Sequence, residues 1–90
     1  MVWTVELEKE ARKQLSKIDP QIAKRILFFL FDRVSTLENP RDIGEALHGE
    51  KFGEYWKYRV GDYRIICNIQ DEKITVMVLK IGHRREVYKH

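Results

Sequence analysis

Three cationic side chains lie close together in residues 54–66, which read EYWKYRVGDYRII. Alternating apolar residues flank a Gly61-Asp62 pair, and this pattern predicts two antiparallel strands joined by a two-residue turn. In that register Arg59 faces Arg64, and like charges directly opposite each other destabilise a sheet by about 0.2–1 kcal/mol unless an anion lies between them. The strand pattern offers no acidic residue on this face. A phosphate site is one interpretation; long side chains that splay into water are the other.

The same alternation divides the hairpin into two faces. One face is apolar and suited to a core: Trp56, Tyr58, Val60, Tyr63, Ile65, Cys67 and Ile69. The other, which we call the cation face, carries the basic residues and their neighbours: Tyr55, Lys57, Arg59, Arg64, Ile66 and Asn68. The next strand is expected to add Met77 and Leu79 as an apolar floor. Such a surface suits a phosphate and a stacked base of single-stranded RNA or DNA, or an acidic protein segment.

The elements that position this face predict an α+β fold. VWTV begins the chain as a short strand, and Leu7, Ala11, Leu15 and Ile18 then recur at helical spacing. Asp19-Pro20 is typical of a helix start and opens a second helix that is expected to end near Leu37. A glycine-containing loop over residues 41–54 leads to strands over residues 55–60, 63–69 and 74–81. We therefore expect the order β-α-α-β-β-β, with a helical hairpin on one face of a small antiparallel sheet.

The second helix has two apolar stripes. Ile22, Ile26, Phe29, Leu30, Val34 and Leu37 form the first, and Ala23, Leu27 and Phe31 form the second. The second stripe either packs on the first helix or receives a helix from a partner protein.

Length and composition bound the class of protein. Ninety residues, 43% of them hydrophobic and 34% charged, predict a single globular domain over residues 1–90. The chain shows neither a membrane-length apolar run nor a signal-peptide pattern, so we expect a cytoplasmic protein without a membrane partner. Residues 51–90 hold 9 Lys and Arg against 5 Asp and Glu, which favours a polyanionic partner for the C-terminal half. The single cysteine, Cys67, is expected to be a small buried side chain.

The order of elements and the motifs YWKYRVGDYRII, ALHGE and VMVLKIGHRREVY resemble the RelE/ParE superfamily of toxins from toxin–antitoxin systems, most closely its RelE branch. The resemblance covers nearly the whole chain. It implies a ribosome-dependent endoribonuclease that cleaves mRNA in the decoding site to a 2′,3′-cyclic phosphate. It also implies that no metal or cofactor is needed and that a cognate antitoxin holds the toxin inactive, with a toxin–antitoxin heterotetramer as a candidate assembly.

The resemblance also assigns roles to individual positions. Lys57 matches the catalytic lysine, Arg64 the arginine that stabilises the transferring phosphate, Arg84 the arginine that protonates the leaving group, and Tyr88 the tyrosine that stacks on the substrate base. Further RNA-binding positions are Arg59, Tyr55, His83 and Arg85. Tyr55 is a departure, because some members have a second lysine there.

The implied chemistry is consistent with these residue types. RNA cleaves itself when a 2′-OH attacks the adjacent phosphorus, so the protein must align groups, neutralise charge and move protons. Nearby guanidinium groups disfavour the charged form of Lys57 and would favour its use as a base. Arginine holds its proton tightly, which makes Arg84 a weak acid and leaves His83 as a competitor for that role. No Cys, His or carboxylate spacing indicates a metal site.

Two rival interpretations predict no catalysis. One is a ParE-like toxin that inhibits DNA gyrase, although that class usually lacks this lysine and arginine set. The other is a non-catalytic domain whose basic face holds an acidic antitoxin or RNA.

Overall fold

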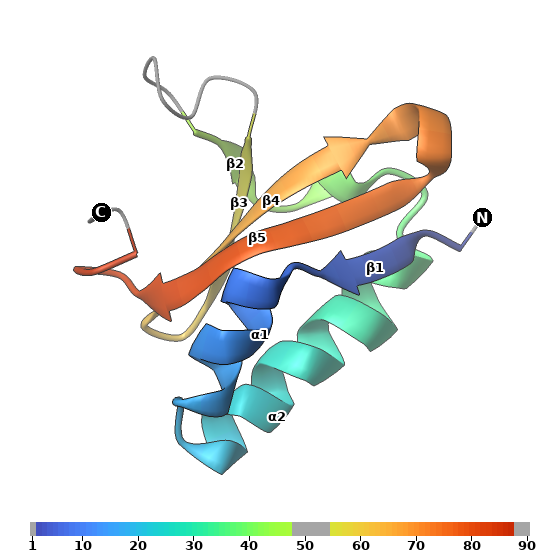
Figure 1. Cartoon of the computed structure of the whole chain (residues 1–90). Coiled ribbons are helices and arrows are strands. Elements are labelled where there is room, and N and C mark those ends of the chain that lie inside the picture. The colour runs from blue at the N-terminus through green and yellow to red at the C-terminus, as the bar shows by residue number, and fades with distance from the viewer. Residues whose placement is uncertain (1, 48–54, 88–90) are drawn as a thin grey trace.

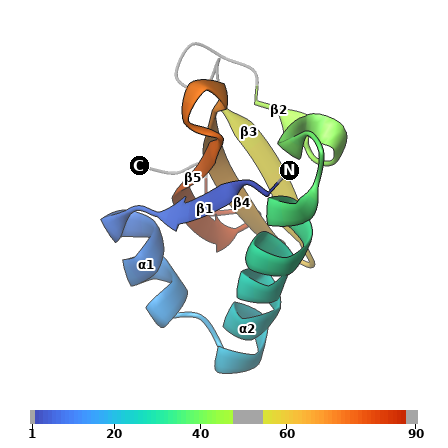
Figure 2. The ribbon, with the colours of Figure 1, turned by 90° about the vertical axis from the view of Figure 1, so that its right-hand side faces the viewer.

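The computed structural model describes residues 2–47 and 55–87 and contains two helices on one face of a five-stranded sheet (Figures 1 and 2). The elements follow in the order β1 (Thr4–Leu7), α1 (Lys9–Ser16), α2 (Pro20–Phe28), β2 (Glu45–Ala46), β3 (Trp56–Val60), β4 (Tyr63–Gln70) and β5 (Thr75–His83). The strands lie in the order β1-β5-β4-β3-β2. The predicted α+β fold with a helical hairpin is confirmed.

The sheet is mixed, which departs from the expected antiparallel sheet in two details. β1 pairs in parallel with β5, from Thr4 opposite Thr75 to Leu7 opposite Val78, whereas the other pairs are antiparallel. β2 adds a short edge strand within the segment predicted to be a loop. The second departure matters for the site, because β2 brings a new side chain to the edge of the cation face.

The core lies between the helices and the inner face of the sheet. α1 contributes Ala11, α2 contributes Ile26, and the sheet contributes Tyr58, Ile65, Cys67, Val76, Val78 and Ile81. Burial raises the pKa of the Cys67 thiol, so this side chain is a neutral core residue, as predicted. Phe31 remains 45% exposed, so the first helix does not cover the whole second apolar stripe. Phe28, which belongs to neither predicted stripe, is 67% exposed.

The second helical segment begins at a capped turn and changes its winding before it ends. The Asp19 carboxylate accepts a hydrogen bond from the backbone N–H of Gln21 at 2.9 Å, and Pro20 occupies the first helical position. After α2 the chain continues as a π-helical turn, η1 (Phe29–Arg33), and a 3-10 turn, η2 (Val34–Thr36), close to the predicted end. None of the described helices is long and apolar enough to span a membrane.

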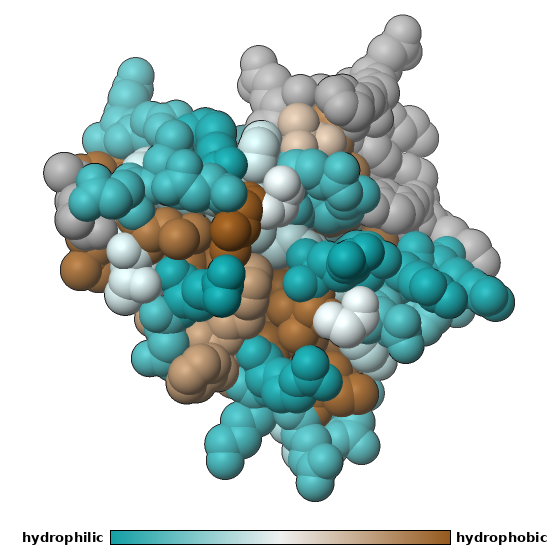
Figure 3. Space-filling model, turned by 180° about the vertical axis from the view of Figure 1, so that it is seen from behind, coloured by the Kyte–Doolittle hydropathy of each residue, from teal (hydrophilic) through white to brown (hydrophobic). Residues whose placement is uncertain are grey.

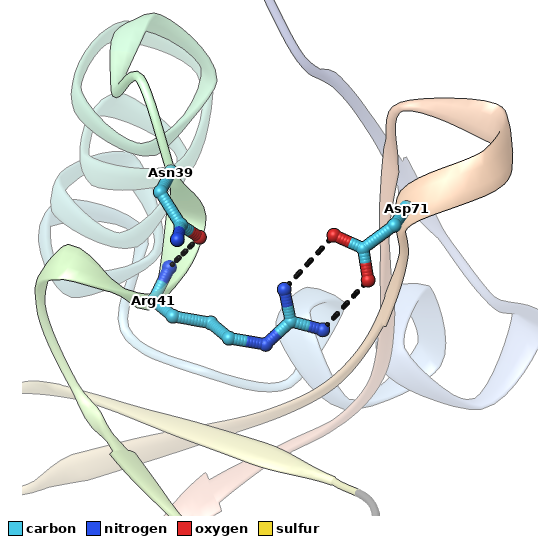
Figure 4. A network of polar contacts seen from close by, with 3 residues as sticks. All are labelled: Asn39, Arg41 and Asp71. Carbon is cyan, nitrogen blue, oxygen red and sulfur yellow. Dashed lines mark hydrogen bonds and ion pairs between the residues drawn. The ribbon is translucent and has the colours of Figure 1, made fainter.

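An ion pair attaches the segment after this helix to the far end of the sheet. Pro40–Asp42 forms a 3-10 turn, η3, in which the Asn39 side chain accepts a hydrogen bond from the backbone N–H of Arg41. The Arg41 guanidinium then donates two hydrogen bonds of 2.9 Å to the Asp71 carboxylate in the β4–β5 connection (Figure 4). This bidentate contact lowers the pKa of Asp71. It fixes the connector from which β2 emerges.

Candidate functional site: a cationic sheet face

The predicted hairpin register is confirmed. Arg59 lies opposite Arg64, Lys57 lies opposite Ile66, and Val60 lies opposite Tyr63 across the turn. Gly61 has a φ of +58°, which glycine adopts without steric cost at the first position of such a turn. The predicted apolar face packs on the helices, with Tyr58, Ile65 and Cys67 at its centre. The basic side chains therefore share the outer face of the sheet.

One expectation about this face was wrong: an acidic residue does reach it. Glu45 in β2 lies opposite Lys57 in β3, and its carboxylate is 3.3 Å from the Lys57 ammonium group. Glu45 was missed because residues 41–54 show no strand period. The Arg59–Arg64 pair lies two residues farther along β3, so Glu45 is matched to the lysine and not to the two arginines.

Close packing of the preceding loop fixes the position of Glu45. The Trp56 indole donates a hydrogen bond to the Ile43 carbonyl at 2.8 Å, and the Tyr58 hydroxyl donates one to the Pro40 carbonyl at 2.6 Å. Gly44 has a φ of +83° and lies so close to β3 that an added Cβ would be 2.5 Å from the Lys57 carbonyl oxygen. Only glycine fits both the backbone conformation and the space, and this close approach allows β2 to pair.

A β-bulge adds Lys80 to the outer side of the sheet. Strict alternation from Val76 and Val78 would place Lys80 in the core, but the register between β4 and β5 shifts at Ile66 and Cys67. After the shift Lys80 lies opposite Ile66, and Ile81 is buried instead. The sequence signal was present but not used, since a lysine at a core position requires an irregular strand.

The C-terminal turn packs against the cation face. Val87 is buried with Leu47 and Ile66 in a small second core, against which the partly buried Tyr55 packs. It lies on Gly82, where an added Cβ would meet the Val87 side chain at 3.3 Å. Ile66 is consequently only 2% exposed, so the expected apolar floor is covered at this point and does not lie open to a ligand.

The predicted site residues that follow the hairpin, where the structure describes them, lie in two different places: beside the β3–β4 turn and on the helix side of the sheet. The backbone N–H of Arg84 donates to the Asp62 carbonyl at 2.7 Å, which holds the exposed Arg84–Arg85 pair beside the β3–β4 turn. His83 lies opposite Tyr63, with ring centroids 5.9 Å apart, and therefore on the helix side of the sheet, away from Arg64. Tyr88 lies outside the described residues. The structure thus brings Lys57, Arg59 and Arg64 together with Lys80, and it separates His83 from them.

Hydrogen bonds orient one of the arginines toward the turn. The Arg64 guanidinium donates to the carbonyl oxygens of Gly61 and Tyr63, each at 3.2 Å. These neutral partners leave its charge uncompensated and available to an anion. Across residues 2–47 and 55–87, no group of three or more His, Cys, Asp or Glu side chains could hold a metal ion. With its lysine and arginine side chains, the described face can stabilise negative charge.

A helical hairpin on a small mixed sheet, with cations on the opposite face, defines a RelE-like toxin fold. The family described as "ParE toxin of type II toxin-antitoxin system, parDE" matches residues 5–88. The chain is also 34% identical over 89 residues to Toxin RelG of Mycobacterium tuberculosis, covering 99% of both chains. The mRNA interferase toxin RelE of Escherichia coli is 34% identical over 82 residues, which cover 89% of this chain and 79% of that protein. The chain belongs to this family and is a RelE-like toxin of a type II toxin–antitoxin system.

Solved structures agree with this assignment. The toxin–antitoxin complex RelBE2 of Mycobacterium tuberculosis matches with a TM-score of 0.84 and 31% identity, over 96% of this chain and 95% of that one. The archaeal RelE–RelB complex of Pyrococcus horikoshii matches with a TM-score of 0.72 and 26% identity, over 96% and 99% of the two chains. Both similar structures are complexes of a toxin with its antitoxin.

Proposed function

We propose that this toxin is a ribosome-dependent mRNA endonuclease that a cognate antitoxin neutralises. In the proposed reaction a general base, the role proposed for Lys57, removes the proton of the 2′-hydroxyl as its oxygen attacks the adjacent phosphorus. The bond from phosphorus to the 5′-oxygen breaks, and that oxygen takes up a proton from a donor. The products are a 2′,3′-cyclic phosphate and a free 5′-hydroxyl. The observation that carries the proposal is the alignment of Arg59 and Arg64 beside Lys57 on one face of a rigid sheet.

The role of the cations follows from the charge that develops during this reaction. The phosphate gains negative charge as the 2′-oxygen attacks, and donors that are already in place stabilise this charge without reorganisation. Arg64 is held by backbone carbonyls and Lys57 by Glu45, so both are positioned before substrate binds. Arg84 is the proposed proton donor, and Tyr88 the proposed stacking partner of the base. The placement of His83 on the helix side favours Arg84 over His83 for the leaving group.

The relatives favour this function over the rival one. The RelE relative of Escherichia coli is named an mRNA interferase, and it supports RNA cleavage in this chain at 34% identity. The gyrase-inhibiting alternative rests on the family name ParE, which the matching family carries. The two functions differ in their product, since only the nuclease leaves new 5′ ends in mRNA.

The test is incubation of purified toxin with ribosomes programmed with a defined mRNA, followed by mapping of new 5′ ends. We expect cuts in phase with the codons, and a loss of at least about a hundredfold in the Lys57→Ala/Arg64→Ala double variant, since each removed charge donor contributes on the order of tenfold or more. Arg12→Ala on the exposed side of α1 is the matched control. Absence of phased cuts, or equal cutting by the double variant, would refute the proposal.

The antitoxin is the second partner that we propose. RelB antitoxins are bound in the similar complexes, and the basic C-terminal half of this chain suits an acidic protein. We expect the antitoxin to cover the cation face or to displace the segment after β5. A structure of the complex in which the whole cation face stays exposed would contradict this.

A further inference from the structure

A cavity of about 400 Å³ lies at the edge of the sheet beside the cation face. β2 pairs only with Trp56 and Lys57, so the edge of β3 from Tyr58 to Val60 has no strand partner among the described residues. η1 lies across from this edge and supplies the opposite wall. The cavity is lined by Phe29, Arg33, Ile43, Gly44, Glu45, Lys57, Tyr58 and Arg59. Figure 3 shows this side of the molecule from behind, with hydrophobic side chains exposed between hydrophilic ones.

The charges around the cavity are mostly positive. Arg33 comes from the helical side, and Lys57 and Arg59 come from β3. Arg33 and Arg59 are both exposed, and neither guanidinium has a hydrogen bond or ion pair with another described residue. Glu45 is the one carboxylate among the described residues of the lining, and it contacts Lys57. Three cations around one carboxylate form a site that can accept a further anion.

The cavity is continuous with the proposed RNA site. Lys57 and Arg59 belong both to the cavity lining and to the cation face. Val87 and Leu47 cover Ile66 at the centre of that face, so a nucleic-acid strand cannot lie flat across β4 at this point. One accessible way past Arg59 is along the edge of β3 toward Arg33, which lines the same cavity. Phe29, Ile43 and Tyr58 give the cavity an apolar wall that suits a sugar or a base.

We propose that this cavity is a second phosphate-binding subsite for single-stranded RNA, next to the site of cleavage. Arg33 and Arg59 bind a backbone phosphate of a neighbouring nucleotide. Glu45 is an internal anion that occupies Lys57 until the RNA phosphate replaces it. The inference rests on the proposed function for the identity of the ligand, but it concerns binding. It gives Arg33 a role that the cleavage chemistry does not require, and it gives Glu45 a second role beside the positioning of Lys57.

The test measures binding of a short fluorescent single-stranded RNA that carries a 2′-deoxy nucleotide at the cleavage position, so that no 2′-OH can attack. Anisotropy titrations are made over a range of salt concentrations. Arg33→Ala is expected to weaken binding about tenfold, because it removes a charge-assisted hydrogen bond. It should also lower the slope of log affinity against log salt by about 0.7, the value for one phosphate contact on a single strand.

Glu45→Gln gives the opposite prediction. Loss of the carboxylate removes the anion that competes for Lys57, so RNA binding should become stronger and the salt slope steeper by up to about 0.7. Arg33→Lys keeps the charge and should retain most of the affinity. Arg12→Ala removes an exposed arginine of α1, which packs on β5 at the other side of the sheet, and should change neither quantity. Thermal unfolding confirms that each variant is folded.

The outcomes separate this inference from the proposed function. If Arg33→Ala binds as Arg12→Ala does, or if Glu45→Gln fails to strengthen binding, the subsite is refuted while cleavage on the ribosome can still stand. A wild-type chain that does not bind the RNA even at low salt also refutes the subsite. If both variants behave as expected but no ribosomal cleavage occurs, the subsite holds and the nuclease does not. If Arg33→Ala weakens an antitoxin complex but not RNA binding, the cavity is a protein interface and the inference is wrong.

Discussion

Replacement of Gly44 by alanine tests whether the close approach of the loop to β3 positions Glu45. The added methyl group would be 2.5 Å from the Lys57 carbonyl oxygen, 2.6 Å from the Trp56 indole nitrogen and 2.9 Å from Tyr58 Cδ1. The carbonyl belongs to a paired strand, and the indole is held by its hydrogen bond to Ile43, so neither can move at low cost. The loop itself must therefore shift away from β3.

The magnitude follows from comparison with Gly61, the matched control. Gly61 also has a positive φ, but an added Cβ there would meet nothing within 4 Å. Both substitutions place an alanine in the left-handed backbone conformation, which costs about 1–2 kcal/mol of folding free energy. This cost is partly offset by about 0.4–1 kcal/mol, because alanine lowers the conformational entropy of the unfolded chain. Only Gly44→Ala adds the cost of overpacking, about 1–3 kcal/mol. We therefore expect the Gly44 variant to be about 2 kcal/mol less stable than the Gly61 variant.

Urea and thermal unfolding of the two variants measure this difference. For a domain of this size, about 2 kcal/mol corresponds to a Tm lower by about 8–16 °C. Hydrogen exchange should show faster exchange of the amides that pair β2 with β3 in the Gly44 variant only. If Gly44→Ala and Gly61→Ala unfold at the same Tm, the close approach does not hold β2 in place, and the argument for a fixed Glu45 fails.

Two further predictions concern buried polar groups. Tyr58→Phe leaves the Pro40 carbonyl without the hydroxyl that donates a hydrogen bond to it. We therefore expect urea unfolding to show that the free energy of unfolding falls by about 1–3 kcal/mol. An unchanged urea midpoint would mean that this hydrogen bond contributes nothing to stability. Burial raises the pKa of the Cys67 thiol, so the folded chain keeps a proton that the unfolded chain loses above its reference pKa of about 8.5. The contribution of this thiol to stability should be constant below that pH and fall as pH rises above it, by up to about 1.4 kcal/mol per pH unit. Cys67→Ala should flatten the decline, and an identical slope in that variant would contradict the assignment.

The hairpin at the centre of the site was predictable from the sequence because residues close together in the chain determine it. Alternation from Trp56 to Ile65 and a glycine at the turn determine the register and assign each side chain to a face. Arg59 and Arg64 had to meet once the apolar residues faced the helices. The same reasoning placed Cys67 in the core.

Other parts of the site could not be predicted because they depend on tertiary contacts. β2 has two residues, too few for any period, and it exists because Gly44 fits against β3 and Trp56 binds the Ile43 carbonyl. Lys80 reaches the outer side through a bulge that no alternation rule places. His83 was predicted to lie with the RNA-binding residues. β5 continues two residues beyond its predicted end and carries this side chain to the helix side.

The predicted and unpredicted residues together determine where on the outer side of the sheet an anion binds most favourably. The outer side of the sheet has two rows, with Lys57, Ile66 and Lys80 in one and Arg59, Arg64 and Gly82 in the next, about 7 Å away along the strands. In the first row Glu45 already compensates Lys57, and the Val87 turn covers Ile66. In the second row the two arginines face each other, and no described carboxylate is paired with either of them. The repulsion between Arg59 and Arg64 is thus left for a bound anion to relieve, and this favours a phosphate at the turn end of the hairpin, beside Arg84.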